Sequence, residues 1–223
     1  MSDAIKRYYT IQKSGEVEAR DGRVDKTIQL IPAKGCKILD VGCNDGFLSK
    51  LLQKDGNIVT GIEINKELAL EAKRKISEVV IQDLEEPWQV DSNAFDIVHM
   101  GAILEHLFDY HHVLNEANRV LKDNGVLIIS VPNFGYVIHR LELLIGRVPR
   151  WYTTTFDHIR PWTKSWLKQV LERHGFYPTT WVGTFIKDVP FLIKIAHHLP
   201  SFSSILICKS IKVKDAKVSE LGK

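Results

Sequence analysis

Residues 40–46 read Asp40-Val41-Gly42-Cys43-Asn44-Asp45-Gly46 and follow a short apolar stretch. The stretch at 36–41 predicts a buried strand, and residues 47–54 predict a helix with leucines along one face. A glycine-containing loop between a strand and a helix lies at the carboxyl edge of an α/β sheet, where such sheets bind their ligands. We therefore expect residues 40–46 to form part of a cofactor site.

The rest of the chain alternates β-rich apolar stretches with helical patterns. The predicted strands are residues 36–41, 57–62, 79–82, 95–101, 126–131, 176–182 and 204–211. The predicted helices are residues 24–31, 47–54, 65–76, 109–121, 137–145, 164–174 and 190–199. This order predicts an α/β fold with a Rossmann-like, doubly wound, seven-stranded sheet, mainly parallel with an antiparallel last strand and with helices on both faces.

We expect residues 1–223 to form a single domain. Within it, we expect an N-terminal flap at 1–23, an insertion over the active-site edge at 133–162 and a flexible tail at 212–223.

Composition excludes several classes of protein. The chain has 30 basic and 27 acidic residues, which is too even a balance to indicate nucleic-acid binding. Its three cysteines form no C-x-x-C pair, and no apolar stretch approaches the ~20 residues that span a bilayer. We expect a cytoplasmic protein with no stable membrane insertion.

The loop does not fit a phosphate-containing ligand. Aligned on Gly42, the second and third glycines of a dinucleotide-binding loop are replaced by Asn44 and Phe47. Asp45 adds negative charge where a helix N-terminus would otherwise favour phosphate. S-adenosylmethionine carries no phosphate, and it fits this loop.

Acidic residues end the next two predicted strands. Glu63 follows the second strand and could accept hydrogen bonds from both ribose hydroxyls. Asp83 follows the third and could accept from the adenine amino group, although acids at strand ends often cap the next helix instead. Gly42 and Gly46 would let backbone approach the methionine part, and Asp40 could either hold the loop or accept from the ammonium.

Five motifs in order resemble those of class I S-adenosylmethionine-dependent methyltransferases. They are Lys37-Ile38-Leu39-Asp40-Val41-Gly42-Cys43-Asn44-Asp45-Gly46, Gly61-Ile62-Glu63, Gln82-Asp83-Leu84, Phe95-Asp96-Ile97-Val98 and Ile103-Leu104-Glu105-His106-Leu107. The resemblance, strongest to type 11- and 23-like small-molecule enzymes, implies S-adenosylmethionine as cofactor. The cofactor-binding residues expected on all these grounds are Asp40, Gly42, Cys43, Asn44, Gly46, Glu63, Ile64, Asp83, Leu84, Gly101 and Ala102.

The acceptor side is less well defined. His106 and His158 are the candidate catalytic bases, although a histidine at the start of a helix can equally be structural. The candidate substrate-pocket residues are Tyr9, Asn133, Phe134, Tyr136, Trp151, Asp157 and Arg160, with ordinary packing as the alternative for the aromatic ones. The paired histidines at 111–112 and 197–198 lack the spacing of metal ligands, so no metal site is predicted.

Two functions remain open. The first is methyl transfer to a small-molecule, lipid- or sugar-like acceptor. The second is a cofactor-binding regulatory or scaffold partner of a biosynthetic enzyme, because residues 130–147 also resemble methyltransferase-like proteins associated with methionine biosynthesis. A homodimer or a complex with a partner enzyme would suit either function. Asn44 and Phe47 disfavour a nicotinamide oxidoreductase. The residues Met100-Gly101-Ala102-Ile103, at the end of the fourth predicted strand, disfavour an enzyme that methylates nucleic-acid bases.

Overall fold

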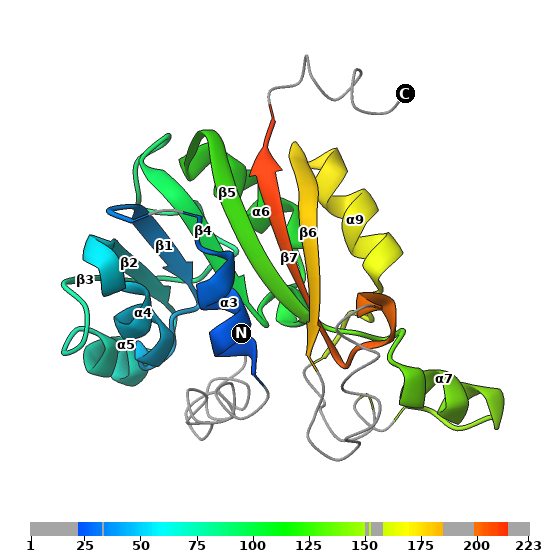
Figure 1. The fold of residues 1–223 in the computed structure, drawn as a ribbon. Helices are drawn as coiled ribbons and strands as arrows, with labels where there is room; N and C mark the ends of the chain where they lie inside the picture. The colour runs from blue at the N-terminus through cyan, green and yellow to red at the C-terminus, as the bar shows by residue number, and fades with distance from the viewer. Residues whose placement is uncertain (1–21, 33, 150–151, 153–157, 185–198, 214–223) are drawn as a thin grey trace.

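The fold is a seven-stranded sheet covered by helices on both faces (Figure 1). It is seen in a computed structural model that describes residues 22–32, 34–149, 152, 158–184 and 199–213. The strands lie in the order β3-β2-β1-β4-β5-β7-β6. Their bounds are β1 Lys37–Val41, β2 Ile58–Glu63, β3 Glu78–Ile81, β4 Phe95–Gly101, β5 Leu121–Pro132, β6 Phe176–Thr184 and β7 Ile205–Lys212.

The predicted sheet is confirmed. Strands β1 to β5 pair in parallel, whereas β7 runs antiparallel to both of its neighbours. The strand order reverses between β1 and β4, so the carboxyl ends of these two strands border the crevice where such a sheet binds ligands. The loop at 40–46 therefore leaves the sheet at this crevice.

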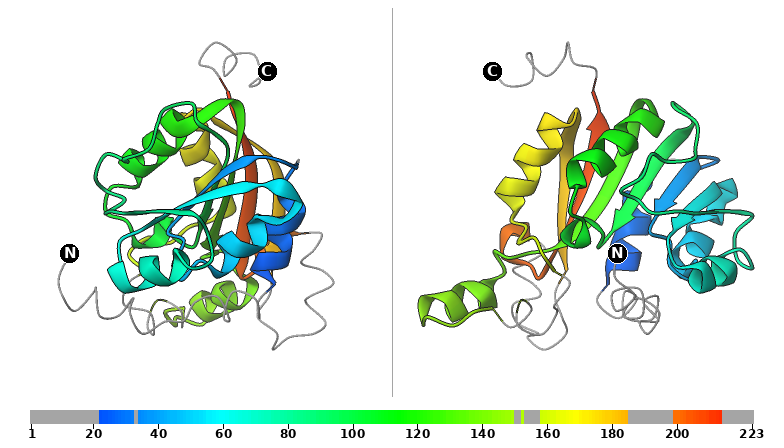
Figure 2. Two further views of the ribbon diagram at one scale, coloured as in Figure 1. Left: turned by 90° about the vertical axis from the view of Figure 1, so that its left-hand side faces the viewer. Right: turned by 180° about the vertical axis from the view of Figure 1, so that it is seen from behind.

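The helices divide between the two faces of the sheet (Figures 1 and 2). Apolar side chains of α3 (Arg23–Leu30), α4 (Phe47–Leu52) and α5 (Lys66–Ala72) share one buried cluster with the sheet. Those of α6 (Tyr110–Val120) and α9 (Lys164–Arg173) share a second cluster on the opposite face. Short 3-10 helices cover Lys54–Gly56, Leu104–His106 and Pro200–Phe202. Within the described ranges, no helix is long and apolar enough to cross a bilayer.

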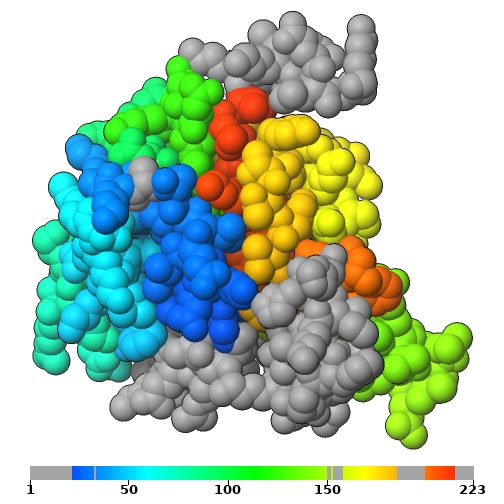
Figure 3. All heavy atoms as spheres, viewed as in Figure 1, coloured from blue at the N-terminus to red at the C-terminus, as the bar shows by residue number. Residues whose placement is uncertain are grey.

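Helix α7 (Val137–Leu144) stands apart from both layers (Figure 3). It follows β5 directly and extends away from the body of the molecule. Several of its apolar side chains and those just after it are exposed, namely Leu141, Leu143, Leu144, Ile145 and Val148. The helix predicted at 190–199 lies outside the described residues except for Leu199.

A buried carboxylate joins three elements beneath the crevice. Asp40, at 2% exposure, accepts a 2.5 Å hydrogen bond from the Ser49 hydroxyl on α4. Its other oxygen lies 2.8 Å from Nδ1 of His99 on β4. Burial of a charge is tolerated only when hydrogen bonds replace its hydration, so these bonds fix β1, α4 and β4 relative to one another.

A second polar network holds the loop that follows β3. The Glu116 carboxylate accepts from the Trp88 backbone at 2.7 Å and pairs with Arg119, which also donates to the Trp88 and Val90 carbonyls. The indole Nε1 of Trp88 donates to the Leu84 carbonyl at 3.0 Å. Helix α6 thereby positions the chain immediately after Asp83.

Asp40→Ala should lower the free energy of unfolding by about 2–4 kcal/mol, because it strips the buried His99 ring and Ser49 hydroxyl of their shared partner. Urea denaturation followed by tryptophan fluorescence measures the change. Asp96→Ala is the matched control, since its partly exposed carboxylate pairs with Lys122 and should contribute less than about 1 kcal/mol. Equal losses in the two variants would contradict the role given to Asp40.

Glu116→Gln should destabilise the protein at pH 7 by about 1–3 kcal/mol. The hydrogen bond from Arg119 lowers the pKa of Glu116 below its ordinary value of 4.5, so the carboxylate stabilises the fold above that pH. Its contribution is lost as the pH falls toward the folded-state pKa, and the gap between variant and wild type should shrink there. Urea titrations at several pH values test this, with the exposed Glu71→Gln as control. A gap that does not depend on pH would refute it.

Candidate functional site

The glycines at 42 and 46 are required by the backbone of the loop. Their φ angles are +72° and +74°, in the left-handed region that favours glycine. A Cβ on Gly42 would lie 2.3 Å from Cδ1 of Ile103, and one on Gly46 would lie 2.9 Å from Cα of Ala72. The backbone amides of Gly42 and Cys43 both donate to the Ile62 carbonyl, at 2.8 and 3.0 Å. The loop is therefore packed closely against β2, α5 and the chain after β4.

The side chains of the loop are engaged within the protein. Asn44 has a φ of +51° and accepts from the Asp45 backbone at 2.7 Å. Asp45 caps α4 through the Phe47 amide and forms a 2.7 Å ion pair with Lys75. Cys43 is buried, and burial raises the pKa of its thiol, so it stays protonated. A ligand at this loop would therefore meet mainly backbone groups rather than side chains.

Glu63 lies at the end of β2 and faces the same loop. Its carboxylate is 7% exposed and accepts from the backbone amides of Asn44 at 3.0 Å and Asn65 at 2.8 Å. Burial raises the pKa of Glu63, while the backbone donors act in the opposite direction. Asn65 also caps α5, as the sequence predicts, and Ile64 between them is half-buried.

Asp83 follows β3 and is half-buried. Its Oδ1 accepts from the Glu85 backbone at 3.0 Å, so the capping role left open by the sequence is present. Within the part of the chain that the structure describes, no donor forms a hydrogen bond with Oδ2, so that atom can accept a further donor. Leu84 next to it is buried against the core.

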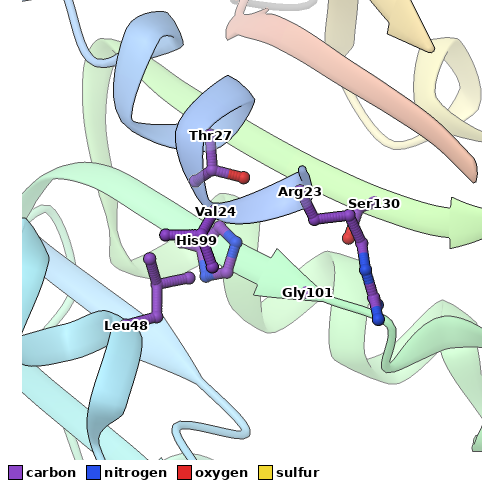
Figure 4. A pocket seen from close by; sticks show the side chains of 7 residues that line it. All are labelled: Arg23, Val24, Thr27, Leu48, His99, Gly101 and Ser130. Carbon is purple, nitrogen blue, oxygen red and sulfur yellow. The ribbon is translucent and has the colours of Figure 1, made fainter. Parts of the chain in front are cut away.

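A small pocket lies where β4 ends (Figure 4). It is lined by Arg23, Val24, Thr27, Leu48, His99, Gly101 and Ser130. The absence of a side chain at Gly101 leaves room for the His99 ring, because a Cβ on residue 101 would lie 2.8 Å from Cε1 of that imidazole. Ala102 follows with a φ of +52° and donates to the Ser130 carbonyl at 3.0 Å. The pocket places the predicted residue Gly101 beside Arg23.

Arg23 is a candidate that the sequence does not reveal. An arginine at the start of an amphipathic helix usually faces solvent, and only the docking of α3 on the sheet brings this one to the end of β4. Asp40, by contrast, uses both carboxylate oxygens in bonds to Ser49 and His99. Of its two predicted roles, the structure favours the one in which it holds the loop.

Glu105, His106 and His158 meet beyond β4, and we call them the histidine cluster. The imidazole rings of His106 and His158 have centroids 5.0 Å apart, and Glu105 is 1% exposed. The Glu105 Oε1 lies 3.8 Å from the His106 Nε2. Each residue places one ligand-type atom within 4.8 Å of the others. The sequence predicts both histidines as catalytic candidates, but Glu105 was treated only as a structural neighbour.

Two predicted pocket residues have structural roles instead. Asn133 is 1% exposed, and its amide donates to the Ser201 and Ser203 carbonyls. The Arg160 guanidinium donates to the Leu107 and Phe108 carbonyls and lies 4.6 Å from the centroid of a tyrosine ring. These side chains fasten the segment at 133–162 to the rest of the fold.

The aromatic candidates separate into two groups. Phe134 is half-buried and meets Tyr152 edge to face at 5.1 Å, and the Tyr152 ring lies 6.3 Å from that of His158. Burial, with a smaller contribution from the charge on Glu105, raises the pKa of Tyr152, so its hydroxyl keeps its proton. Tyr136 is buried against His139. Tyr9, Trp151 and Asp157 lie outside the described residues.

The groups at this edge match S-adenosylmethionine in their chemistry. Carboxylates at the ends of β2 and β3 can accept from ribose hydroxyls and an adenine amino group, and an arginine near the end of β4 can pair with a carboxylate. Lys75 beside the loop is paired with Asp45 at 2.7 Å. The residues present therefore fit this cofactor.

Comparison with known proteins agrees with this fit. Residues 3–180 match the model of a family described as a methyltransferase domain. The ubiquinone biosynthesis O-methyltransferase of Coxiella burnetii is 30% identical over 165 residues, covering 67% of this chain and 70% of that protein.

Solved structures share the fold. A SAM-dependent methyltransferase of Thermotoga maritima superposes with a TM-score of 0.72 at 17% identity, over 95% of this chain and 100% of that one. A Haloferax volcanii chain solved in complex with the Trm112 methyltransferase activator superposes with a TM-score of 0.70 at 14% identity, over 96% of this chain and 100% of that one.

The site and the family match lead to the same conclusion. The loop, the acids at successive strand ends and the strand order are those on which the family resemblance rests. The match covers most of the chain. The chain belongs to the class I S-adenosylmethionine-dependent methyltransferases, and S-adenosylmethionine is its cofactor.

Proposed function

We propose that this enzyme transfers the methyl group of S-adenosylmethionine to a hydroxyl oxygen of a small-molecule acceptor. The observation that carries the proposal is the histidine cluster, in which Glu105 and His106 lie in the chain that leaves β4 just after Gly101 and Ala102 and meet His158 from a later segment. The Coxiella burnetii relative is named as an O-methyltransferase, which supports the same choice of acceptor atom.

The chemistry explains why the cluster points to a hydroxyl. The bound cofactor supplies a methyl group on a sulfonium, which is a good leaving group, so positioning and water exclusion provide much of the acceleration. A group that removes a proton is useful when the acceptor is a hydroxyl, whose oxygen is a weak nucleophile until it is deprotonated. Two imidazoles beside a buried carboxylate supply the groups for that step.

We assign the cofactor contacts to three side chains. Glu63 accepts from the ribose hydroxyls, Asp83 from the adenine amino group, and Arg23 pairs with the methionine carboxylate. Glu63 can accept from the loop and the ribose together, because a carboxylate offers about four acceptor sites.

The aromatic residues next to the cluster favour an acceptor with an apolar or aromatic body. Phe134 and Tyr152 present ring surface beside His158, and the hydroxyl of the half-buried Tyr152 remains a donor. A phenolic or lipid-like acceptor would place its ring or tail on this surface and its hydroxyl toward the cluster.

One observation favours the alternative, a cofactor-binding partner of another enzyme. The exposed apolar side chains of α7, such as Leu144 at 81% exposure, resemble a protein-binding surface more than an ordinary solvated helix. This alternative requires cofactor binding without methyl transfer to any small acceptor, and the activity measurement below separates the two.

Glu63→Ala should weaken binding of S-adenosylhomocysteine by at least about tenfold, which corresponds to ~1.4 kcal/mol, because it removes the acceptor for the ribose hydroxyls. Titration calorimetry measures the change. His158→Ala is the comparison and should alter the affinity less than about twofold, since it acts on the acceptor side. Losses of equal size in both variants would overturn this division of the site, and thermal melting checks that each variant is folded.

The purified chain should methylate a hydroxyl of phenolic acceptors, and mass spectrometry with isotope-labelled cofactor locates the new methyl group. His158→Ala should lower kcat by about 10²–10⁴-fold, because proton removal from the acceptor is impaired. His111→Ala is the matched control, since this exposed histidine meets His174 and the Tyr110 ring and is not a member of the cluster. Methylation at nitrogen or carbon would refute the proposal, and cofactor binding with no product across the acceptor panel would favour the partner protein.

A further inference from the structure

We propose that the histidine cluster, Glu105, His106 and His158, binds one divalent transition-metal cation such as Mn²⁺ or Zn²⁺. The sequence predicts no metal site and identifies His106 and His158 only as candidate bases. The fold brings the three ligand atoms within 4.8 Å of one another. Among the described residues, no other group of three such side chains meets this condition.

The donor set selects the class of ion. Two imidazole nitrogens and one carboxylate oxygen suit cations of intermediate softness, whereas Mg²⁺ and Ca²⁺ prefer sets made of oxygen alone. A 2-His-1-carboxylate set also leaves coordination positions open for water or a substrate oxygen. The cluster therefore has the composition of a site that binds both an ion and a ligand.

The distances fit two ligands of one ion better than a hydrogen-bonded dyad. Oε1 of Glu105 and Nε2 of His106 are 3.8 Å apart, beyond the ~3.2 Å limit of an ordinary N–H···O hydrogen bond. Atoms that share an ion at ~2.1 Å lie about 3.0–3.4 Å apart. A small change in side-chain torsions would close the remaining gap.

The burial of the cluster also suits an ion site. Glu105 is 1% exposed, so its carboxylate lies largely out of bulk water, where the attraction between opposite charges is stronger. His106 and His158 are only partly buried, so the ion could still be reached from solvent.

The protein holds both parts of the cluster in place by contacts that need no ion. The Ile159 backbone amide donates to the Glu105 carbonyl at 3.0 Å, which fixes the chain beside His158 against the chain beside His106. Arg160 adds hydrogen bonds to the Leu107 and Phe108 carbonyls. Ligands oriented in advance lose less freedom when the ion binds.

The role of the ion rests on the proposed function, although its binding does not. With the ion bound, the two imidazoles act as ligands rather than as bases, and an acceptor hydroxyl in an open position would instead have its pKa lowered by the ion. Its proton then passes to solvent, its oxygen forms the new bond to the methyl carbon, and the electron pair of the broken carbon–sulfur bond stays on sulfur. A diphenol with neighbouring oxygens could occupy two open positions together.

Mn²⁺ titration of the EDTA-treated full chain, followed by the electron paramagnetic resonance signal of free Mn²⁺, tests the site. We expect one ion per chain, displaced by Zn²⁺, without cofactor or acceptor. His106→Ala and His158→Ala should each weaken binding at least about tenfold, as should Glu105→Gln. His111→Ala should not, although His111 lies 3.0 Å from another histidine, His174. No stoichiometric binding, or loss in the His111 variant rather than in the cluster variants, would overturn the inference.

The two proposals can fail separately. Stoichiometric binding that needs the cluster supports the metal site even where no O-methylated product forms. Product formed at the same rate before and after EDTA treatment, by a chain that binds no Mn²⁺, overturns the metal site and leaves the O-methyl transfer intact. If the Glu105→Gln variant does not fold, the His106→Ala and His158→Ala variants, whose side chains are only partly buried, still test whether the cluster binds the ion.

Discussion

The buried carboxylate of Asp40 is the constraint on which the site depends. It joins β1 to α4 through Ser49 and to β4 through His99. The His99 ring in turn lies against the Gly101 backbone and forms one wall of the pocket that Arg23 lines. One acid therefore sets the relative positions of the loop, the end of β4 and the first helix. Because it is almost fully buried and both of its oxygens are bonded to Ser49 and His99, it shapes the site through the scaffold.

In the cofactor contacts that we propose, Glu63 couples the shape of the loop to the binding of the nucleoside. Its oxygens already accept from the amides of Asn44 and Asn65, so the loop and the start of α5 are fixed around the carboxylate before a ligand arrives. The residue at 44 needs a left-handed backbone, which asparagine tolerates better than most side chains. A loop that departs from the usual glycine at this position can thus keep the geometry, because Glu63 holds its amide in place.

The fold, and the places of Glu63 and Asp83 at the ends of successive strands, could be predicted from the sequence, because their signals are local. Alternating apolar stretches gave the sheet and its antiparallel last strand, and Asn65 marked the start of α5. The acceptor half could not be predicted as well. Asn133 and Arg160 have the polarity of pocket residues, but their partners are backbone carbonyls distant in sequence, which no spacing rule identifies. Arg23 and Glu105 were missed for the same reason, since each gains its meaning only from the tertiary fold.

The two halves of the site are built in different ways, and the histidine cluster spans the boundary between them. Glu105 and His106 belong to the chain leaving β4, which the sheet positions, whereas His158 belongs to the segment at 133–162. That segment is attached by side chain-to-backbone bonds, from Asn133 on one side and Arg160 on the other. Docking of the segment therefore completes the cluster. Because those attachments do not involve the aromatic surface of Phe134 and Tyr152, that surface can change to suit another acceptor while the cluster stays assembled.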